Sequence, residues 1–319
     1  ISGALGAEVA GVDLGEDMDE SLIAALREAL LEHGVIFFRD QDFDADAHKR
    51  LARRFGKIFV HPFFVFGNDP EVVTIVREPG DTRIVGEDWH IDTTMMPEPP
   101  MGAILIAIEA PDYGGDTLFA NQYLAYEALS DGMKSLLENL KAVNSDRRVA
   151  GPGAAARSSG RATKARTDSE WRETISIHPV VRTHPETGRK SLFINHSYTV
   201  GLEGMSEEES KPLLDWLMDW GHRPEFTCRF RWRKGSVAFW DNRCTQHHAI
   251  WDYFPETRRG YRVTIPLKTR LPMCLVMWQK SIKKTCKSWS RLARKPIMLP
   301  PTISANWGSK SITKTCFTA

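Results

Sequence analysis

Apolar and aromatic residues are concentrated in short runs, and this pattern constrains the fold of the chain more than any other feature. The predicted strands are Val35–Phe38, Ala103–Ala110, Ser191–Asn195, Phe226–Trp232, Ser236–Asp241 and Arg262–Leu267. Turns and long insertions separate them, which is typical of an antiparallel double-sheet roll rather than of a parallel sheet. Neither G-x-G-x-x-G after a strand nor G-x-x-x-x-G-K-[ST] occurs, so a nucleotide-binding fold has no support. The sequence therefore predicts an α+β protein with a mainly β core.

Helical periodicity and capping residues predict four helices around these strands. Leucines recur at every fourth position from Leu22 to Leu30, and Gly34 is placed to end that helix. Ser206 and Glu209 form a capping-box pattern before another helix. The predicted helices are Asp19–Gly34, Asp44–Phe55, Ser130–Leu140 and a segment that begins after Ser206.

Charge is distributed unevenly, which suggests two parts of the chain. Ten of the 42 Lys and Arg residues, but none of the 41 Asp and Glu residues, lie in residues 269–319. We interpret residues 1–268 as the folded domain and the basic tail as an unstructured extension or the product of a reading-frame error, although a basic tail could also contact an anionic surface. The acidic body gives no reason to expect nucleic acid, and no run of about 18 apolar residues predicts a membrane span.

The cysteine pattern and the amino terminus bear on where the protein works. Five cysteines at irregular spacing form neither a disulfide framework nor a CxxC pair, which favours a reducing cytoplasm. The chain starts at Ile1 without a signal-peptide pattern, and we interpret this start as truncated or processed.

The segment Asn144–Trp171 is rich in Gly, Ala, Ser and Arg and lacks an apolar period. A solvated surface loop is the simpler interpretation. The alternative is a lid that closes over a substrate and brings arginines toward an anion.

Two metal-binding side chains stand two residues apart in Trp89-His90-Ile91-Asp92. In an extended segment His90 and Asp92 point to the same side, so both can bind one ion. His247, just after a predicted strand, is a candidate third ligand. Two histidines and one carboxylate leave three positions of an octahedral Fe(II) open, as non-haem iron oxygenases require. A zinc hydrolase could use the same three residues, and an H-x-D pair alone is weak evidence.

Several further motifs occur in an order that makes the chain resemble the family of taurine dioxygenase and 2,4-dichlorophenoxyacetate dioxygenase. The resemblance runs from Gly6 to Thr264. It rests on Trp89–Asp92, Gly114-Gly115-Asp116-Thr117, Ala125–Ser130, His178–Pro185, Trp240–His247, Asp252-Tyr253, Arg258 and Arg262. The resemblance implies a double-stranded β-helix (jelly-roll) core with flanking helices, an enzyme that uses Fe(II), 2-oxoglutarate and O2, and a homo-oligomer, either dimer or tetramer.

The resemblance also implies roles for individual residues. His90, Asp92 and His247 correspond to the iron ligands, and Thr117 and Arg258 to residues that hold the distal carboxylate of 2-oxoglutarate. Arg262, four residues beyond Arg258, would face the same way in a strand and serve an anionic group near the iron, from cosubstrate or substrate. His61 and Tyr198 are further candidates for substrate contact.

The implied reaction is hydroxylation of a small organic anion next to its anionic group, with formation of succinate and CO2. Phe64 and Gly86 stand where taurine dioxygenase has a tyrosine and an asparagine, so two polar contacts to taurine are missing. An alkylsulfonate, alkyl sulfate or aryloxyalkanoate is therefore expected instead of taurine. The alternative functions are a halogenase, which Asp92 argues against, and a non-catalytic jelly-roll protein that binds a metal or ligand.

Overall fold

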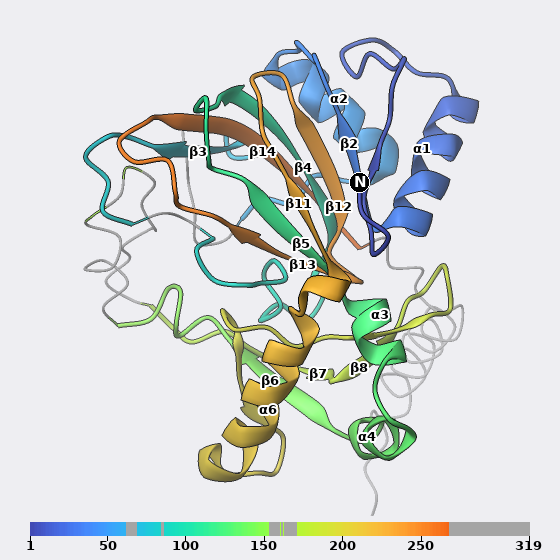
Figure 1. Cartoon of the computed structure of the whole chain (residues 1–319), viewed down its shortest axis with the longest axis vertical. Helices are drawn as coiled ribbons and strands as arrows, with labels where there is room; N and C mark the ends of the chain where they lie inside the picture. The colour runs from blue at the N-terminus through green and yellow to red at the C-terminus, as the bar shows by residue number, and fades with distance from the viewer. Residues whose placement is uncertain (62–68, 84–85, 153–159, 161, 163–170, 268–319) are drawn as a thin grey trace, which may run out of the picture. The chain divides into compact units, whose positions relative to one another are not determined.

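A computed structural model describes residues 1–61, 69–83, 86–152, 160, 162 and 171–267 (Figure 1). The basic tail, Phe64 and most of the 153–170 segment lie outside the described residues. None of the helices among the described residues is long and apolar enough to cross a membrane.

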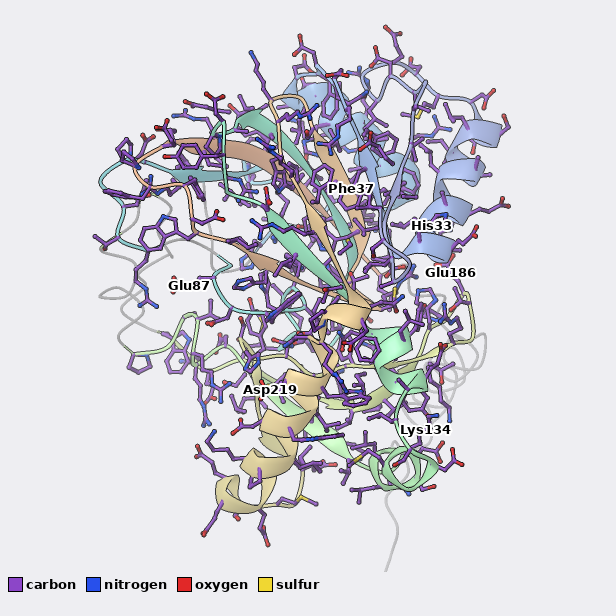
Figure 2. The ribbon with its side chains drawn as sticks, viewed as in Figure 1. His33, Phe37, Glu87, Lys134, Glu186 and Asp219 are labelled. Carbon is purple, nitrogen blue, oxygen red and sulfur yellow. The ribbon has the colours of Figure 1, made fainter. Side chains whose placement is uncertain are left out.

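The largest sheet has six strands, and every neighbouring pair except the first is antiparallel. In spatial order these strands are β1 (Ala7–Glu8), β2 (Val35–Phe38), β12 (Val237–Asp241), β4 (Pro100–Glu109), β14 (Arg258–Pro266) and β3 (Val73–Arg77). A three-stranded antiparallel sheet consists of β11 (Thr227–Phe230), β5 (Thr117–Asn121) and β13 (Thr245–Ala249). These two sheets share one apolar core, in which the Phe37 ring, labelled in Figure 2, stacks on Phe230 at a centroid distance of 4.0 Å.

The other face of the six-stranded sheet is covered by α1 (Glu20–His33) and α2 (Ala45–Phe55), which Figure 1 shows beside β2. Both helices start where predicted, and each start is an Asp N-cap: Asp19 accepts from the backbone N–H of Leu22 and Asp44 from that of Ala47. Gly34 ends α1 at φ 71°, a conformation that glycine adopts without steric cost.

The remaining elements form a second layer around their own apolar cluster, in the lower half of Figure 1. Its strands are β10 (Thr199–Leu202), β6 (Lys141–Ser145) and β7 (Ile175–Pro179) in one sheet, and the hairpin β8 (Val181–Thr183) and β9 (Lys190–Leu192). Its helices are α3 (Gln122–Glu127), α4 (Asp131–Leu137), α6 (Glu207–Gly221) and the 3-10 turn η1 (Pro224–Phe226). The predicted capping box at Ser206 and Glu209 is present, since each side chain bonds to the other residue's backbone N–H.

Helices and mostly antiparallel sheets confirm the predicted α+β class, while several boundaries were wrong. The helix from Ser130 ends at Leu137, and β9 ends at Leu192 instead of Asn195. The segment from Asn144 was predicted to be irregular, but Asn144 and Ser145 belong to β6 and are fully buried. Tertiary hydrogen bonds explain the difference at Asn144, because its Oδ1 accepts from the hydroxyls of Thr94 and Thr199 at 3.1 and 2.9 Å.

Candidate metal centre and anion-binding cavity

Three side chains from two separate segments converge at the edge of the two-sheet core. His247 lies on β13, and an isolated β-bridge pairs it with His90 through two backbone hydrogen bonds of 3.0 and 2.9 Å. Asp92 Oδ1 lies 3.9 Å from Nε2 of His90 and 3.9 Å from Nε2 of His247. Two ligand atoms that are each about 2.1 Å from one ion can be at most about 4.2 Å apart, so each of these pairs can hold a metal ion.

The protonation states of these groups suit a metal as well. Burial lowers the pKa of both His90 and His247, so both imidazoles are neutral near pH 7. The His90 Nδ1 lies 2.7 Å from the carbonyl oxygen of Asp88, which makes Nδ1 the protonated nitrogen and leaves the Nε2 lone pair for a metal. Burial raises the pKa of Asp92, but Arg262 and the two histidines outweigh it and hold that carboxyl well below its usual pKa.

The turn after Asp92 is held in an unusual conformation. Thr93 has φ 47°, in the left-handed region that β-branched residues rarely adopt. Neighbouring groups hold this turn: Thr94 Oγ1 accepts from Asn195 at 3.1 Å, and His178 Nε2 lies 2.9 Å from the Thr94 carbonyl oxygen. Such support from packed neighbours is what allows a strained residue to persist beside a functional group.

A cavity between the two sheets opens beside the two histidines. Its lining includes His90, His247, Thr117, Arg258 and Arg262, so the structure brings together five residues that the sequence analysis singled out. Arg259 also lines the cavity, and the other lining residues are apolar or aromatic, among them Ile75, Leu105, Ala107, Phe119, Trp240 and Ala249.

Arg258 carries a charge at one end of this cavity. Burial lowers the pKa of its guanidinium, and among the described residues no carboxylate forms an ion pair with it. Its neighbours are the Tyr253 hydroxyl, within hydrogen-bonding reach, and the Trp232 ring, whose centroid lies 5.3 Å from the guanidinium carbon. Trp232 also donates its indole N–H to Thr117 Oγ1 at 2.9 Å. Removing a cation from water without an ion-pair partner is costly, and Arg258 is half-buried, so this arrangement is suited to an anionic ligand.

Arg262 carries the second charge, on the same side of β14. Its Nη1 donates to Asp92 Oδ1 at 3.1 Å, so it lies directly beside the candidate metal ligands. His61 is buried nearby, and burial together with the charge of Arg262 lowers its pKa to about 3. His61 is therefore a neutral group next to a cation.

Tyr198 is buried but is not among the residues that line the cavity. Burial raises the pKa of its hydroxyl, which lies in hydrogen-bond contact with the backbone of Thr93. This position supports the turn after Asp92, and a contact of Tyr198 with substrate stays a prediction.

Sequence reasoning missed three supporting residues. Trp232 and Tyr253 contact Arg258, and Asn242 donates to Asp92 Oδ2 at 3.1 Å. Trp232 follows the alternation of buried residues along β11 and could have been placed on the cavity side. Nothing in the pattern indicates what Asn242 touches, because its partner is 150 positions away.

The chain as a whole is similar to the proteins of a known dioxygenase family. The family model "Taurine catabolism dioxygenase TauD, TfdA family" matches residues 1–264, and the chain belongs to this family. Among its relatives are an alkylsulfatase of Acinetobacter baylyi, 35% identical over 277 residues that make up 83% of each chain, and an α-ketoglutarate-dependent sulfate ester dioxygenase of Pseudomonas putida. The second is 34% identical over 269 residues, which cover 83% of this chain and 87% of the relative.

A solved structure supports the same assignment. The crystal structure of a taurine dioxygenase from Burkholderia xenovorans has a TM-score of 0.68 and 36% sequence identity, and the match covers 83% of this chain and 88% of that one. The predicted family resemblance is thus confirmed. The chain is an oxidoreductase, a 2-oxoglutarate-dependent dioxygenase that works with Fe(II) and O2.

Proposed function

We propose that this enzyme hydroxylates an alkyl sulfate ester on the carbon that carries the sulfate group. Iron would be held by His90, Asp92 and His247, and 2-oxoglutarate by Thr117 and Arg258. The observation that carries the proposal is the placement of two cations, Arg258 and Arg262, on one face of β14, both lining the cavity beside the histidines.

The two arginines have separate tasks in this proposal. Arg258 is half-buried beside the Tyr253 hydroxyl and the Trp232 ring and would take the distal carboxylate of 2-oxoglutarate through its planar guanidinium, with the Thr117 hydroxyl as a second donor. Arg262 lies next to Asp92 and would neutralise the anionic group that is bound nearest the metal. His61, being neutral, can add a hydrogen bond to that anion.

The metal, when bound, supplies the oxidising chemistry: O2 and 2-oxoglutarate are consumed, succinate and CO2 are formed, and one oxygen atom is inserted into the substrate C–H bond. The chain itself orients the reactants and excludes water. Hydroxylation next to a sulfate ester oxygen gives a hemiacetal-like product, which releases inorganic sulfate and leaves an aldehyde.

Sulfate esters are favoured over taurine by the lining of the cavity. Ile75, Leu105 and Ala249 are apolar, and Gly86 offers no polar side chain. A Cβ at Gly86 would lie 3.2 Å from Cε1 of His90, so the glycine keeps the space beside that ligand free. An alkyl chain gains free energy in such surroundings, at roughly 0.8 kcal/mol for each buried CH2 group. The names of the two relatives above point to the same substrate class.

The experiment supplies Fe(II), 2-oxoglutarate and O2 with a panel of alkyl sulfates, alkylsulfonates, aryloxyalkanoates and taurine, and measures succinate and sulfate. The expected result is succinate that rises with alkyl sulfates, is matched by sulfate release and disappears in His90→Ala. Succinate stimulated equally by taurine would refute the proposed substrate class. No stimulation by any compound, in protein that binds iron, would favour a non-catalytic binding protein.

We also propose that the six-stranded and three-stranded sheets form the double-stranded β-helix that the family resemblance implies. The shared core supports this, as does the antiparallel pairing of β5 with β11 and β13. The basic tail, residues 269–319, is proposed not to belong to this domain. A chain shortened to residues 1–268 should therefore retain the thermal stability and the succinate formation of the full chain.

We further propose a cytoplasmic homo-oligomer, either dimer or tetramer. The described cysteines, Cys228 and Cys244, are both free and buried, which fits a reducing compartment. Light scattering on the purified protein would measure its mass directly, and a monomer at all concentrations would contradict the oligomer.

A further inference from the structure

We propose that Asn242 is a positioning residue that restricts Asp92 to binding the metal through one oxygen. The inference rests on the metal site of the proposed function, but not on the identity of the substrate. It assigns a task to a residue that contacts neither the cavity nor the reactants.

The two oxygens of the Asp92 carboxylate have different surroundings. Oδ1 faces the site, because it lies 3.9 Å from Nε2 of both His90 and His247 and accepts from Arg262. Oδ2 faces away and accepts from Nδ2 of Asn242 at 3.1 Å. Asn242 and Asp92 are 0% and 4% exposed, so little water competes for this hydrogen bond.

The amide of Asn242 has its orientation fixed by Trp240. The indole Nε1–H can only donate, and it lies 3.0 Å from Oδ1 of Asn242. A flipped amide would place its NH2 group against the indole N–H and its oxygen against the Asp92 carboxylate. Both contacts would be repulsive, so the NH2 group must point toward Asp92 Oδ2.

Backbone and packing contacts also fix the position of the Asn242 side chain. The Asn242 backbone N–H donates to the carbonyl oxygen of Met101 at 2.8 Å, directly after β12. Trp240, on β12, packs between the sheets against Phe119 and against the His247 ring, with centroid distances of 5.9 and 4.8 Å. A chain of contacts therefore runs from the core of the sheet through Trp240 and Asn242 to the carboxylate.

The hydrogen bond from Asn242 to Asp92 would affect how many coordination positions of a bound metal ion stay free. Two histidines and one carboxylate oxygen leave three positions, enough for both donor oxygens of 2-oxoglutarate and one for O2. A carboxylate that turned to bind through both oxygens would occupy one of these. By engaging Oδ2, Asn242 keeps that oxygen away from the metal and preserves the third position.

The test compares Asn242→Leu and Trp240→Phe with the unaltered chain. Asn242→Leu removes the donor at similar volume, and Trp240→Phe removes the indole N–H that orients the amide. Asn121→Ala is the control: it deletes the N-cap of α3, another side-chain amide with three hydrogen bonds, at a residue that does not line the cavity. Mn(II) binding is measured by titration without substrate, followed by 2-oxoglutarate binding to the Mn(II)-saturated protein.

We expect Asn242→Leu to weaken Mn(II) binding roughly 10- to 100-fold, the usual effect of losing a partner that orients a metal ligand. Trp240→Phe should have a smaller effect in the same direction, and Asn121→Ala should change Mn(II) binding less than about twofold. At saturating Mn(II), Asn242→Leu should also bind 2-oxoglutarate more weakly.

Mn(II) affinity that is unchanged in folded Asn242→Leu, or lowered equally in Asn121→Ala, would overturn the positioning role. Unchanged 2-oxoglutarate affinity at saturating Mn(II) would overturn the restriction to one oxygen. If Asn242→Leu does not fold, Trp240→Phe decides the question through the same two titrations. Because the Mn(II) titration needs no substrate, a failed substrate panel would leave its result intact.

Discussion

The two faces of the six-stranded sheet are built from the same strands yet have opposite characters. Toward the helices, β12 and β14 present Val237, Phe239, Val263 and Ile265, which belong to an apolar core with α1 and α2. Toward the three-stranded sheet, the same strands carry aromatic and charged residues of the candidate site. These are Trp240 on β12 and Arg258 and Arg262 on β14.

This comparison shows how a charged cavity can be maintained inside a β core. Successive side chains of a strand point to opposite faces, so one residue of β14 can stabilise the fold while the next serves the site. The apolar face with its helices supplies free energy of folding, whereas a half-buried guanidinium such as that of Arg258 costs free energy unless an anion binds. The two faces should therefore respond differently to substitution.

Ile265→Ala should produce the largest effect on stability. Ile265 is fully buried on the helix side of β14, and truncation of such a residue lowers the free energy of unfolding by about 2–5 kcal/mol. Urea unfolding measures this loss, while KM for 2-oxoglutarate should stay within about twofold of the unaltered enzyme, since Ile265 faces away from the cavity. A large change in KM would show that the two faces are coupled.

Arg258→Met should have the opposite effect to Ile265→Ala: it should raise KM for 2-oxoglutarate and leave the stability of the fold intact. Loss of a charge-assisted contact costs up to about 3 kcal/mol, so KM for 2-oxoglutarate should rise roughly 100-fold. The free energy of unfolding should not fall, because the substitution removes a half-buried charge that has no ion-pair partner among the described residues. Arg54→Met, on α2, is the control, because its partners are the Met18 carbonyl and Glu20. If Arg54→Met raised KM equally, the assignment of Arg258 would be wrong.

The helix-covered face should also carry a pH dependence of its own. His48, on α2, is buried with its Nε2 3.1 Å from the Ile104 carbonyl oxygen, and burial lowers its pKa to about 4. In the unfolded chain His48 becomes protonated below about pH 6.5, whereas in the folded chain it stays neutral down to about pH 4. The free energy of unfolding therefore decreases as the pH is lowered from about 6.5 to about 4. From pH 7.5 to pH 5 the loss from His48 should be about 2 kcal/mol.

This loss is measured as the difference in urea unfolding between the unaltered chain and His48→Gln, which keeps a donor for Ile104. The variant should lose less stability from pH 7.5 to pH 5. Equal losses in both proteins would place the acid sensitivity elsewhere.

Thr117→Val should give the smallest effect. One hydroxyl contact to a carboxylate is worth about 1 kcal/mol, so KM for 2-oxoglutarate should rise about fivefold. Thr117→Ser retains the hydroxyl and should restore KM. A KM for Thr117→Val equal to that of the unaltered enzyme would separate Thr117 from the anion site.

Local signals in the sequence predicted much of the fold. The helix starts at Asp19 and Asp44, the capping box at Ser206 and the stop at Gly34 were predicted correctly, since capping depends on residues within three or four positions. The predicted irregular segment from Asn144 was wrong at its start, because Asn144 lies in β6 and is held by hydrogen bonds to Thr94 and Thr199, 50 and 55 residues away. No local pattern records such bonds.

The features of the candidate site also fall into those that the sequence determined and those that only the tertiary structure decided. The sequence by itself determined which side chains are available: an H-x-D pair, a later histidine, and two arginines four residues apart, which would share one face if both lay in a strand. The predicted strand began only at Arg262, and the structure extends it back to Arg258. Only the tertiary structure decided that Thr117 and Arg258 line the same cavity as His247. It also decided that Asn242 donates to Asp92 and that Trp240 donates to Asn242. The physical reason is that pairing and packing of distant strands fix these contacts, and the periodicity of one strand carries no information about the neighbour it will meet.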